Sequence, residues 1–259
     1  MSFFLILGIL FLFSVMLLYF NGGIKFWTSE TKGEAVTTET APRFEAIQKL
    51  IESCVDQTAR LAVFYLGFIG GDVTPDPWTA QFLQAPYFIY DRLYKIPYYV
   101  YESKILMLSD DQIKADILAR YMDSNLPKCT DGFKAVSYFV VREELPSTIV
   151  TLTDAEVVFS VHYPIYATKG DRSEKIGPDY TSHVWVRLKE ILAIARKITQ
   201  FAGEDDRLIQ WDFMTDVTKK HYNITAYTEK DKTIIYRIID LNNTIDNEPY
   251  KYQFGVRIK

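Results

Sequence analysis

An uninterrupted apolar run near the amino terminus constrains this chain more than any other feature of its sequence. Residues 3–20 read FFLILGILFLFSVMLLYF and include no charged side chain. An α-helix of this length is about 27 Å long, close to the thickness of the hydrocarbon core of a bilayer. A helix also satisfies its own backbone hydrogen bonds, so it is stable in lipid. The sequence therefore predicts a transmembrane anchor over residues 1–21, which contacts the lipid bilayer through residues 3–20.

Two other interpretations of this run are less favoured. A cleaved signal peptide requires a basic start and a cleavage site with small residues. Met1 and Ser2 offer no basic side chain, and Asn21-Gly22-Gly23 is a poor cleavage site. A helix of a soluble core would have to be buried on every face, because the run is apolar all round.

The orientation of the anchor is a point of conflict. Lys25, Lys32 and Arg43 follow the apolar run, and the positive-inside rule would place the following domain in the cytoplasm. A pair of cysteines and two N-x-S/T sequons favour the opposite orientation. We expect a single-pass membrane protein with an extracytoplasmic domain.

The rest of the chain divides into a linker and one domain. Residues 22–41 are rich in Thr, Glu and Gly and lack apolar periodicity, which is typical of a linker or stalk. Residues 42–259 have the length of one globular domain, which we call the ectodomain.

Hydrophobic periodicity predicts an α+β fold for this domain. Apolar residues at intervals of three and four predict helices from Pro42 to the glycines at 67–71, from Ser109 to just before Pro127, and over 188–203. Alternating residues predict strands at 87–90, 96–101, 133–141, 148–152, 157–163, 183–186, 223–227, 233–239 and 250–258. Because short turns join these strands, we expect a mostly antiparallel sheet packed with several helices.

Composition excludes several classes of function. Hydrophobic residues make up 48% and charged residues 24%, as in folded proteins and unlike disordered chains. Lys and Arg total 29 against 33 Asp and Glu, so no basic excess exists to bind nucleic acid. No P-loop, dinucleotide fingerprint or G-x-S-x-G elbow occurs, and the sequence predicts no cofactor.

The two cysteines are candidates for a disulfide. Cys54 lies on the first predicted helix, and Cys129 follows the second. A bond between them would close a loop worth roughly 4–4.5 kcal/mol in the chain-entropy model. The alternative is a pair of buried thiols that pack as small hydrophobic groups. Lys128 and Thr130 beside Cys129 favour the disulfide, and a catalytic cysteine would need a base that the sequence does not place.

A second candidate site is a run of aromatic residues in the predicted hairpin at 87–101. Adjacent aromatic side chains on a strand must point to both faces of the sheet. Packing beneath the helices is the favoured interpretation, and an exposed platform for a partner or a sugar is the alternative. The candidates for partner binding are Tyr87, Tyr90, Tyr94, Tyr98, Tyr99 and Tyr101.

The remaining polar candidates carry weaker signals. His162, His183 and His221 lie outside every metal-binding spacing, so we expect structural or surface histidines and no metal ligands. Paired carboxylates at 110–111, 143–144 and 205–206 are interpreted as helix caps and solvated turns, which leaves no predicted catalytic residue. Asn223 and Asn242 begin the two sequons and are candidates for glycosylation.

The overall arrangement resembles that of uncharacterised single-span membrane proteins of archaea. The resemblance rests on the anchor, on Cys54 in a helix that ends in glycines, on Ile96-Pro97-Tyr98-Tyr99, on Cys129, and on Tyr163-Pro164 and Pro249-Tyr250. It implies an extracytoplasmic α+β domain that is compatible with a disulfide, and it implies no activity.

Three functions are compatible with these features. The favoured one is a membrane-anchored extracytoplasmic domain with a structural or partner-binding role at the cell surface, where the partner is another envelope or cell-surface protein. The first alternative is an anchored envelope hydrolase, which requires a pocket where a histidine meets carboxylates or Cys54. The second alternative is a pilin-like filament subunit, although a basic leader is missing.

Overall fold

The computed structural model of the chain describes residues 44–70, 87–90, 94–102, 104–204, 211–229 and 232–257; for 87–90, 94, 95, 204 and 211 it describes the backbone alone. The chain divides into two compact units, Met1–Ala41 and Pro42–Lys259, and every described residue belongs to the second. The predicted anchor and stalk lie outside the described residues. Among the helices that are described, none has the length and apolar character needed to span a bilayer.

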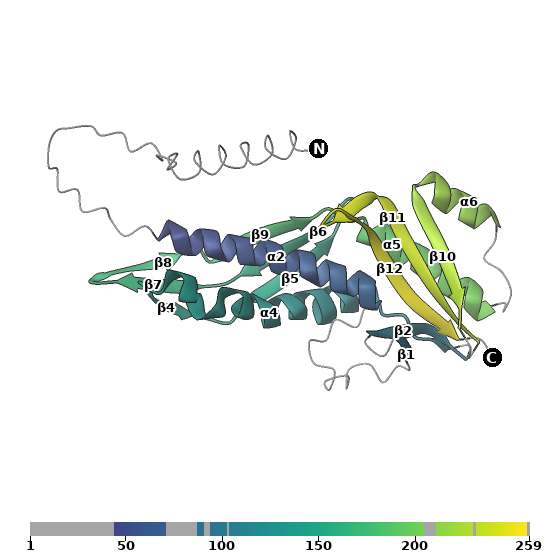
Figure 1. The fold of residues 1–259 in the computed structure, drawn as a ribbon, viewed down its shortest axis with the longest axis horizontal. Helices are drawn as coiled ribbons and strands as arrows, with labels where there is room; N and C mark the ends of the chain where they lie inside the picture. Colours follow the sequence, from purple (N-terminus) through teal and green to yellow (C-terminus); the bar gives the residue numbers. More distant parts are fainter. Residues whose placement is uncertain are drawn as a thin grey trace, which may run out of the picture. The chain divides into compact units, whose positions relative to one another are not determined.

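The prediction of an α+β fold with mostly antiparallel sheets is confirmed (Figure 1). The larger sheet has the strand order β1-β2-β12-β11-β10, and the short β3 pairs with β2. Among the described strands, only β2 and β12 pair in parallel. The strands of this sheet are β1 (Tyr87–Tyr90), β2 (Tyr94–Tyr101), β3 (Lys104–Ile105), β10 (Tyr222–Thr228), β11 (Thr233–Ile245) and β12 (Glu248–Arg257).

The other strands form two short three-stranded sheets that lie end to end. Each of three chain segments supplies one strand to the first sheet and one to the second. The orders are β4-β7-β8 and β5-β6-β9. Since β4 leads into β5, β6 into β7 and β8 into β9, we call the pair of sheets the ribbon. Its strands are β4 (Val140–Glu143), β5 (Ser147–Leu152), β6 (Val157–His162), β7 (Ile165–Lys169), β8 (Arg172–Ile176) and β9 (Asp179–Val184).

A proline interrupts each of the three segments of the ribbon at the same level. Pro146 lies between β4 and β5, Pro164 between β6 and β7, and Pro178 between β8 and β9. Proline has no backbone N–H to give to a ladder. Backbone hydrogen bonds cross the break, from Glu144 N to the Pro164 carbonyl at 3.0 Å and from Tyr163 N to the Pro178 carbonyl. The ladders therefore stop and restart there while the segments stay side by side.

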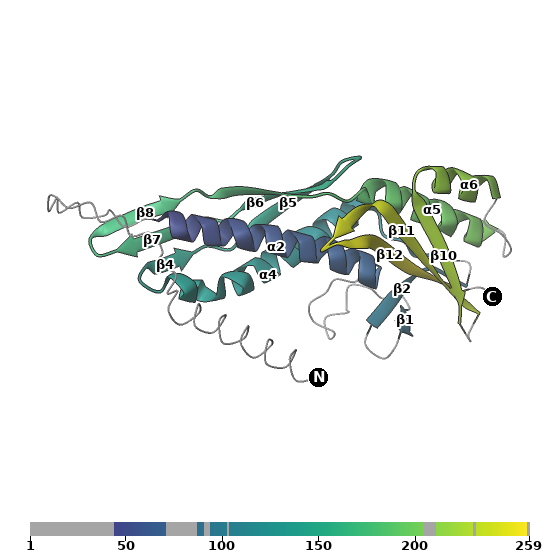
Figure 2. The ribbon, with the colours of Figure 1, turned by 45° about the horizontal axis from the view of Figure 1, so that its top comes forward.

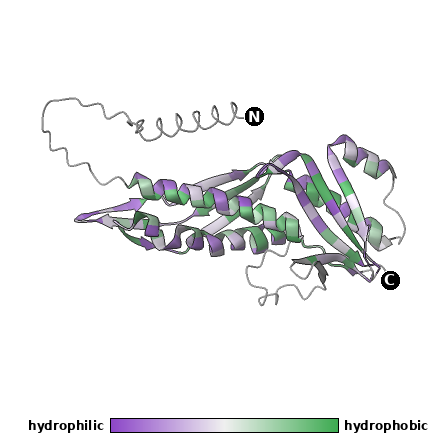
Figure 3. Cartoon of the chain, in the orientation of Figure 1, coloured by the Kyte–Doolittle hydropathy of each residue, from purple (hydrophilic) through white to green (hydrophobic). Residues whose placement is uncertain are grey.

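Helix α2 (Glu45–Ile69) is the long amphipathic helix that the periodicity predicts. Its buried stripe includes Ile47, Ile51, Ala62 and Leu66. The helix ends at Gly70, whose left-handed backbone conformation suits glycine because it has no Cβ. Figure 3 shows apolar and polar residues alternating along α2, as this one-sided burial requires.

The second predicted helix begins as the sequence indicates and ends later. Ser109 and Gln112 form a reciprocal capping box at the start of α3 (Asp110–Gln112), which continues as the π-helical η2 (Ile113–Ala119) and as α4 (Arg120–Thr130). The predicted end before Pro127 is wrong, because Pro127 lies inside α4. Pro127 comes in the last turn of the helix, so its missing N–H removes only one helical hydrogen bond there.

The strand predicted over residues 133–141 is also wrong in its first half. Residues Asp131–Val136 form the 3-10 helix η3, and β4 begins only at Val140. The backbone is left-handed at Asp131, Gly132 and Phe133, so a kink interrupts this element and excludes an extended strand there. Phe133 within the kink and Val136 after it are both buried. Of the three apolar residues at 136, 138 and 140, the first thus ends η3, the second lies in the turn that follows, and the third begins β4.

Two helical layers complete the fold. Helix α2 contacts β9 and β12, while η2 and α4 contact β5, so these helices cover one face of the ribbon (Figure 2). Helix α5 (Leu188–Glu204) contacts β2, β11 and β12 of the larger sheet, and α6 (Trp211–Lys219) leads into β10. The buried side chains of both sheets join one core, in which the inward residues of β6 are Val157, Phe159 and Val161.

Candidate functional site

The face of the ribbon away from the helices is open to solvent in β5, β6 and β9. Burial alternates strictly along β5 and β9, because one face packs on the helices and the other does not. The strand registers align the outer residues in three rows: Ser147–His162–Asp179, Ile149–Ser160–Thr181 and Thr151–Val158–His183. This surface carries few charges and exposes Ile149 to 70%.

The first row has the composition of a catalytic triad. The Nδ1 atom of His162 lies 2.7 Å from Oδ1 of Asp179, and Ser147 lies opposite His162 on the other neighbouring strand. In a serine hydrolase, an aspartate at Nδ1 orients the imidazole so that the other ring nitrogen can activate the serine.

The surroundings of this row do not provide the other requirements of acyl transfer. The side chains of His162 and Asp179 are 55% and 79% exposed, so water competes for their contact. No hydrogen bond between Ser147 and His162 occurs among the described contacts, and a flat strand face provides no enclosed oxyanion site. The geometry of this row therefore gives the hydrolase hypothesis little support.

The other histidines lie apart from the first. His183 is two rows away from His162 on the ribbon, and its Nδ1 lies 3.0 Å from Oε2 of Glu156. Its ring stacks near the exposed Trp185, with centroids 6.5 Å apart. His221 lies in the turn before β10. Among the described residues, no group of three His, Cys, Asp or Glu could hold a metal ion.

Two hollows in the described surface are lined without histidine or cysteine. One, of about 300 Å³, lies between α2 and the turn from β11 to β12 and is mainly apolar, with Phe64, Phe68 and Pro249 in its wall. The other, of about 590 Å³, is a shallow hollow beside the start of α3, where Arg196 pairs with Asp110 at 2.6 Å. Neither hollow brings together the groups that a hydrolase needs.

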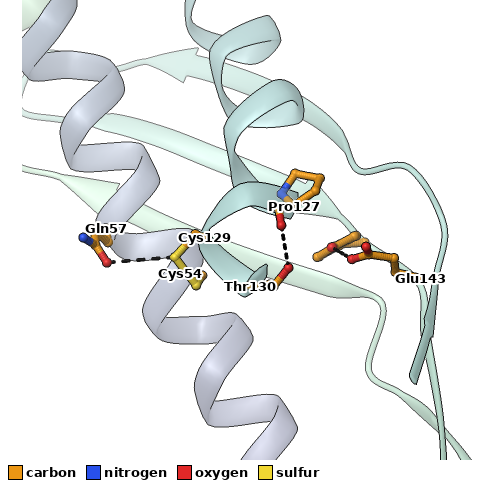
Figure 4. The surroundings of a disulfide bond; sticks show 7 residues. Cys54, Gln57, Pro127, Cys129, Thr130 and Glu143 are labelled. Carbon is orange, nitrogen blue, oxygen red and sulfur yellow. Dashed lines mark hydrogen bonds between the residues drawn. A yellow bond between two sulfur atoms is a disulfide. The ribbon is translucent and has the colours of Figure 1, made fainter. Parts of the chain in front are cut away.

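The cysteine pair lies at disulfide-bonding distance. The Cα atoms of Cys54 and Cys129 are 5.7 Å apart, and the bond joins the first half of α2 to the last turn of α4 (Figure 4). The side-chain amide oxygen Oε1 of Gln57 lies 3.9 Å from the Cys129 sulfur. Cys54 is buried and Cys129 partly buried, so the bond lies at the edge of the helix–helix contact.

The described tyrosines of the aromatic hairpin at 87–101 are buried or partly buried, so they offer little exposed surface. Tyr98 and Tyr99 are 4% and 3% exposed, so they are core residues and the partner-binding hypothesis does not fit them. Tyr101 is partly buried and accepts a hydrogen bond from Arg257 at 3.2 Å. The side chains of Tyr87, Tyr90 and Tyr94 lie outside the described residues.

Buried tyrosines instead attach α2 to the larger sheet. The hydroxyl groups of Tyr99 and Tyr252 bond each other, and Tyr99 also donates to the Gly70 carbonyl at 3.4 Å. Tyr250 donates to the Val63 carbonyl at 3.0 Å. Burial raises the pKa of the Tyr99 and Tyr250 hydroxyls, so both stay protonated donors at neutral pH. These bonds reach backbone carbonyls in the last two turns of α2 and at the residue that ends it, and the sequence pattern did not reveal them.

Both sequon asparagines lie on the surface. Asn223 is exposed on β10, and Asn242 is exposed in β11, where its backbone N–H bonds the Asp240 carboxylate at 3.0 Å. Their exposure is compatible with glycosylation in a translocated domain.

In comparisons with known proteins, no family model, curated protein or solved structure matches the chain.

Proposed function

We propose that the chain is a membrane-anchored protein whose α+β domain lies outside the cytoplasm and has a structural or partner-binding role at the cell surface. The observation that carries the proposal is the contact between Cys54 and Cys129. Disulfides persist in oxidising compartments and are rare in the cytosol. The apolar run at 3–20 supplies the membrane attachment, as the sequence predicts.

The surface of the described residues supports binding better than catalysis. The open ribbon face displays Ser, Thr, Ile and His residues and few charges, a composition compatible with an interface. Its one Ser–His–Asp row is exposed to solvent. The hydrolase alternative has only the solvent-exposed contact between His162 and Asp179 in its favour. The filament alternative has no supporting contact among the described side chains.

Protease treatment of intact cells tests this proposal directly. A membrane-impermeant protease should cut the stalk at residues 22–41 and release a domain that begins near residue 42. Free thiols are blocked beforehand, and a Cys54–Cys129 peptide should appear in the digest without reductant and vanish with it.

A protected domain with two alkylated cysteines would overturn the proposal and place the domain in the cytoplasm. A cytoplasmic marker protein, followed in the same samples, controls for leakage. Detergent-opened cells control for intrinsic resistance, because a folded stalk would resist cleavage there too.

A further inference from the structure

Strand β10 forms an edge of the larger sheet (Figure 1). Its only strand partner among the described residues is β11, and α6, the helix that precedes it in the chain, also contacts it.

The hydrogen-bond pattern shows which backbone groups of β10 face outward. Leu241 N donates to the His221 carbonyl at 3.0 Å, and Glu229 N donates to the Thr233 carbonyl at 2.7 Å. In the β10–β11 register, residues 221 and 229 are therefore hydrogen-bonded positions, and these alternate along an antiparallel pair. The backbone N–H and C=O groups of Tyr222, Ile224, Ala226 and Thr228 consequently point away from β11.

The chemistry of β10 suits pairing with another strand. It reads YNITAYT, with no charge, proline or glycine, and four of its residues are Tyr or Thr, which favour strands. Natural edge strands are usually blocked by lysine, proline, a bulge or a covering element. Strand β10 has no lysine, no proline and no bulge in its pairing with β11.

We propose that β10 pairs antiparallel with β10 of a second copy of this chain, about a two-fold axis at Thr225. In this register Ile224 of each copy faces Ala226 of the other, and Tyr222 faces Thr228. All four outward residues then donate and accept backbone hydrogen bonds. The inference deepens the proposed partner-binding function by naming the partner as a second copy, and it rests on that function for its biological setting.

Thr225 lies on the two-fold axis of this register. Its two copies would face each other as a non-hydrogen-bonded pair, the kind of antiparallel pair in which side chains come closest together.

Charges at the two ends of β10 favour the antiparallel direction. Lys219 and Lys220 precede the strand, and the mixed sequence Glu229-Lys230-Asp231-Lys232 follows it. In the antiparallel register His221 of one copy faces Glu229 of the other, and the two lysines come beside this charge-balanced sequence. Parallel pairing would place the two lysines of one copy beside the same two lysines of the other, which is repulsive.

Site-directed cross-linking of the full-length protein in lipid nanodiscs tests the register. The background carries Asn223→Gln, because Thr225→Cys also removes the sequon. Two Thr225→Cys residues would face each other with Cα atoms about 4.5 Å apart, within the range for a disulfide. The matched variant Tyr227→Cys would lie about 13 Å from its copy, because residue 227 faces residue 223.

Mild oxidation should give a covalent dimer with Thr225→Cys and little with Tyr227→Cys. Equal cross-linking of both variants would overturn the register. Absence of cross-linking in both would overturn the pairing, provided that the Cys54–Cys129 peptide shows each variant to be folded.

A second variant measures the strength of the contact. The Ala226 N–H points outward, so Ala226→Pro removes edge hydrogen bonds without removing a bond to β11. Self-association of the full chain in detergent should weaken by about tenfold or more with Ala226→Pro, and Ala226→Ser should match the unsubstituted protein. A protein that stays monomeric at every concentration, or an Ala226→Pro variant that associates normally, would overturn the proposal.

These results are independent of membrane topology. A protected cytoplasmic domain that still cross-links through Thr225→Cys would refute the surface location and keep the pairing. A released, oxidised domain without the cross-link would support the surface location and refute the pairing of β10 strands.

Discussion

The Arg187 guanidinium holds the fully buried Asp240 carboxylate through two hydrogen bonds, Nε to Oδ2 at 3.1 Å and Nη2 to Oδ1 at 2.5 Å. Arg187 lies just before α5, and Asp240 lies in β11, so the pair fixes the start of the helix to the sheet. The guanidinium also lies 4.2 Å from the centre of the Tyr222 ring. Because Asp240 has no exposed surface, its negative charge loses the stabilisation of water, and the positive charge of Arg187 compensates for that loss.

Replacing Arg187 should therefore lower the stability of the folded protein. Arg187→Met leaves a buried carboxylate without its counter-ion, and we expect the free energy of unfolding to fall by about 3–5 kcal/mol. The measurement is urea denaturation followed by circular dichroism. The double variant Arg187→Met/Asp240→Leu removes both charges and should recover most of the loss; a single variant that costs less than about 1 kcal/mol would contradict the prediction.

The disulfide should contribute to stability chiefly by restricting the unfolded chain. Cys54→Ala/Cys129→Ala opens a loop between residues 75 positions apart, and the expected loss is about 2–4 kcal/mol. Reduction of the unsubstituted protein should bring its urea midpoint to that of the double variant. If reductant leaves the unsubstituted protein unchanged while labelling shows both thiols free, the bond is not a source of stability.

Two glycines in helices should respond to alanine with opposite signs. A Cβ at Gly67 in α2 would collide with the Lys251 carbonyl and lie 2.7 Å from the Tyr250 hydroxyl, so Gly67→Ala should destabilise. A Cβ at Gly203 in α5 would meet Ile105 at 3.7 Å, an ordinary contact, so Gly203→Ala should stabilise by about 0.5–1 kcal/mol through helix propensity. Thermal unfolding of the two variants measures both effects, and a gain for Gly67→Ala would refute the close approach of α2 to β12.

Glu190 should make the fold sensitive to acid. Burial alone would raise the pKa of Glu190, but hydrogen bonds from Lys220 and Tyr222 and the charge of Arg187 outweigh it and lower that pKa. The lower pKa in the folded state adds stability at neutral pH, and this stability is lost as the pH falls through the folded value. Glu190→Gln should thus be less stable than the unsubstituted protein at pH 7, and the difference should shrink in acid. A difference that stays constant with pH would exclude this origin.

Asp123 should show the opposite dependence on pH. Burial beneath β5 raises the pKa of this carboxyl group, although the polar groups of the neighbouring Thr148 oppose the shift. Its Oδ1 atom has no partner among the described residues. A raised pKa in the folded state means that the ionised form destabilises the protein at neutral pH and that protonation relieves this. Asp123→Asn should raise the free energy of unfolding at pH 7, and the gain should disappear below the ordinary pKa of aspartate.

Periodicity was sufficient for the elements with long, one-sided apolar faces. The stripe from Ile47 to Leu66 and the capping residues at Ser109 each predicted a helix where one lies. The cysteine pair also followed from the sequence, since Cys54 and Cys129 lie on two helices that pack together. In these cases local chemistry and tertiary packing favour the same structure.

Elsewhere, packing decided what local pattern could not. Tyr98 and Tyr99 both became core residues because β2 is covered on each side, and alternation cannot distinguish a covered face from an open one. Pro127 is tolerated inside α4 because the helix ends one turn later. The edge position of β10 and the burial of Asp240 depend on which distant strands pair, and no short motif encodes that choice.

The three prolines at 146, 164 and 178 limit how far the ribbon could serve as a template for aggregation. An unbroken edge across this level would offer one long run of backbone groups to any extended chain, whereas the break leaves segments of six residues or fewer. A misaligned strand could add to one segment but would lose its hydrogen bonds at the proline level. The ribbon can thus keep one face open to solvent while its edges resist fibril growth.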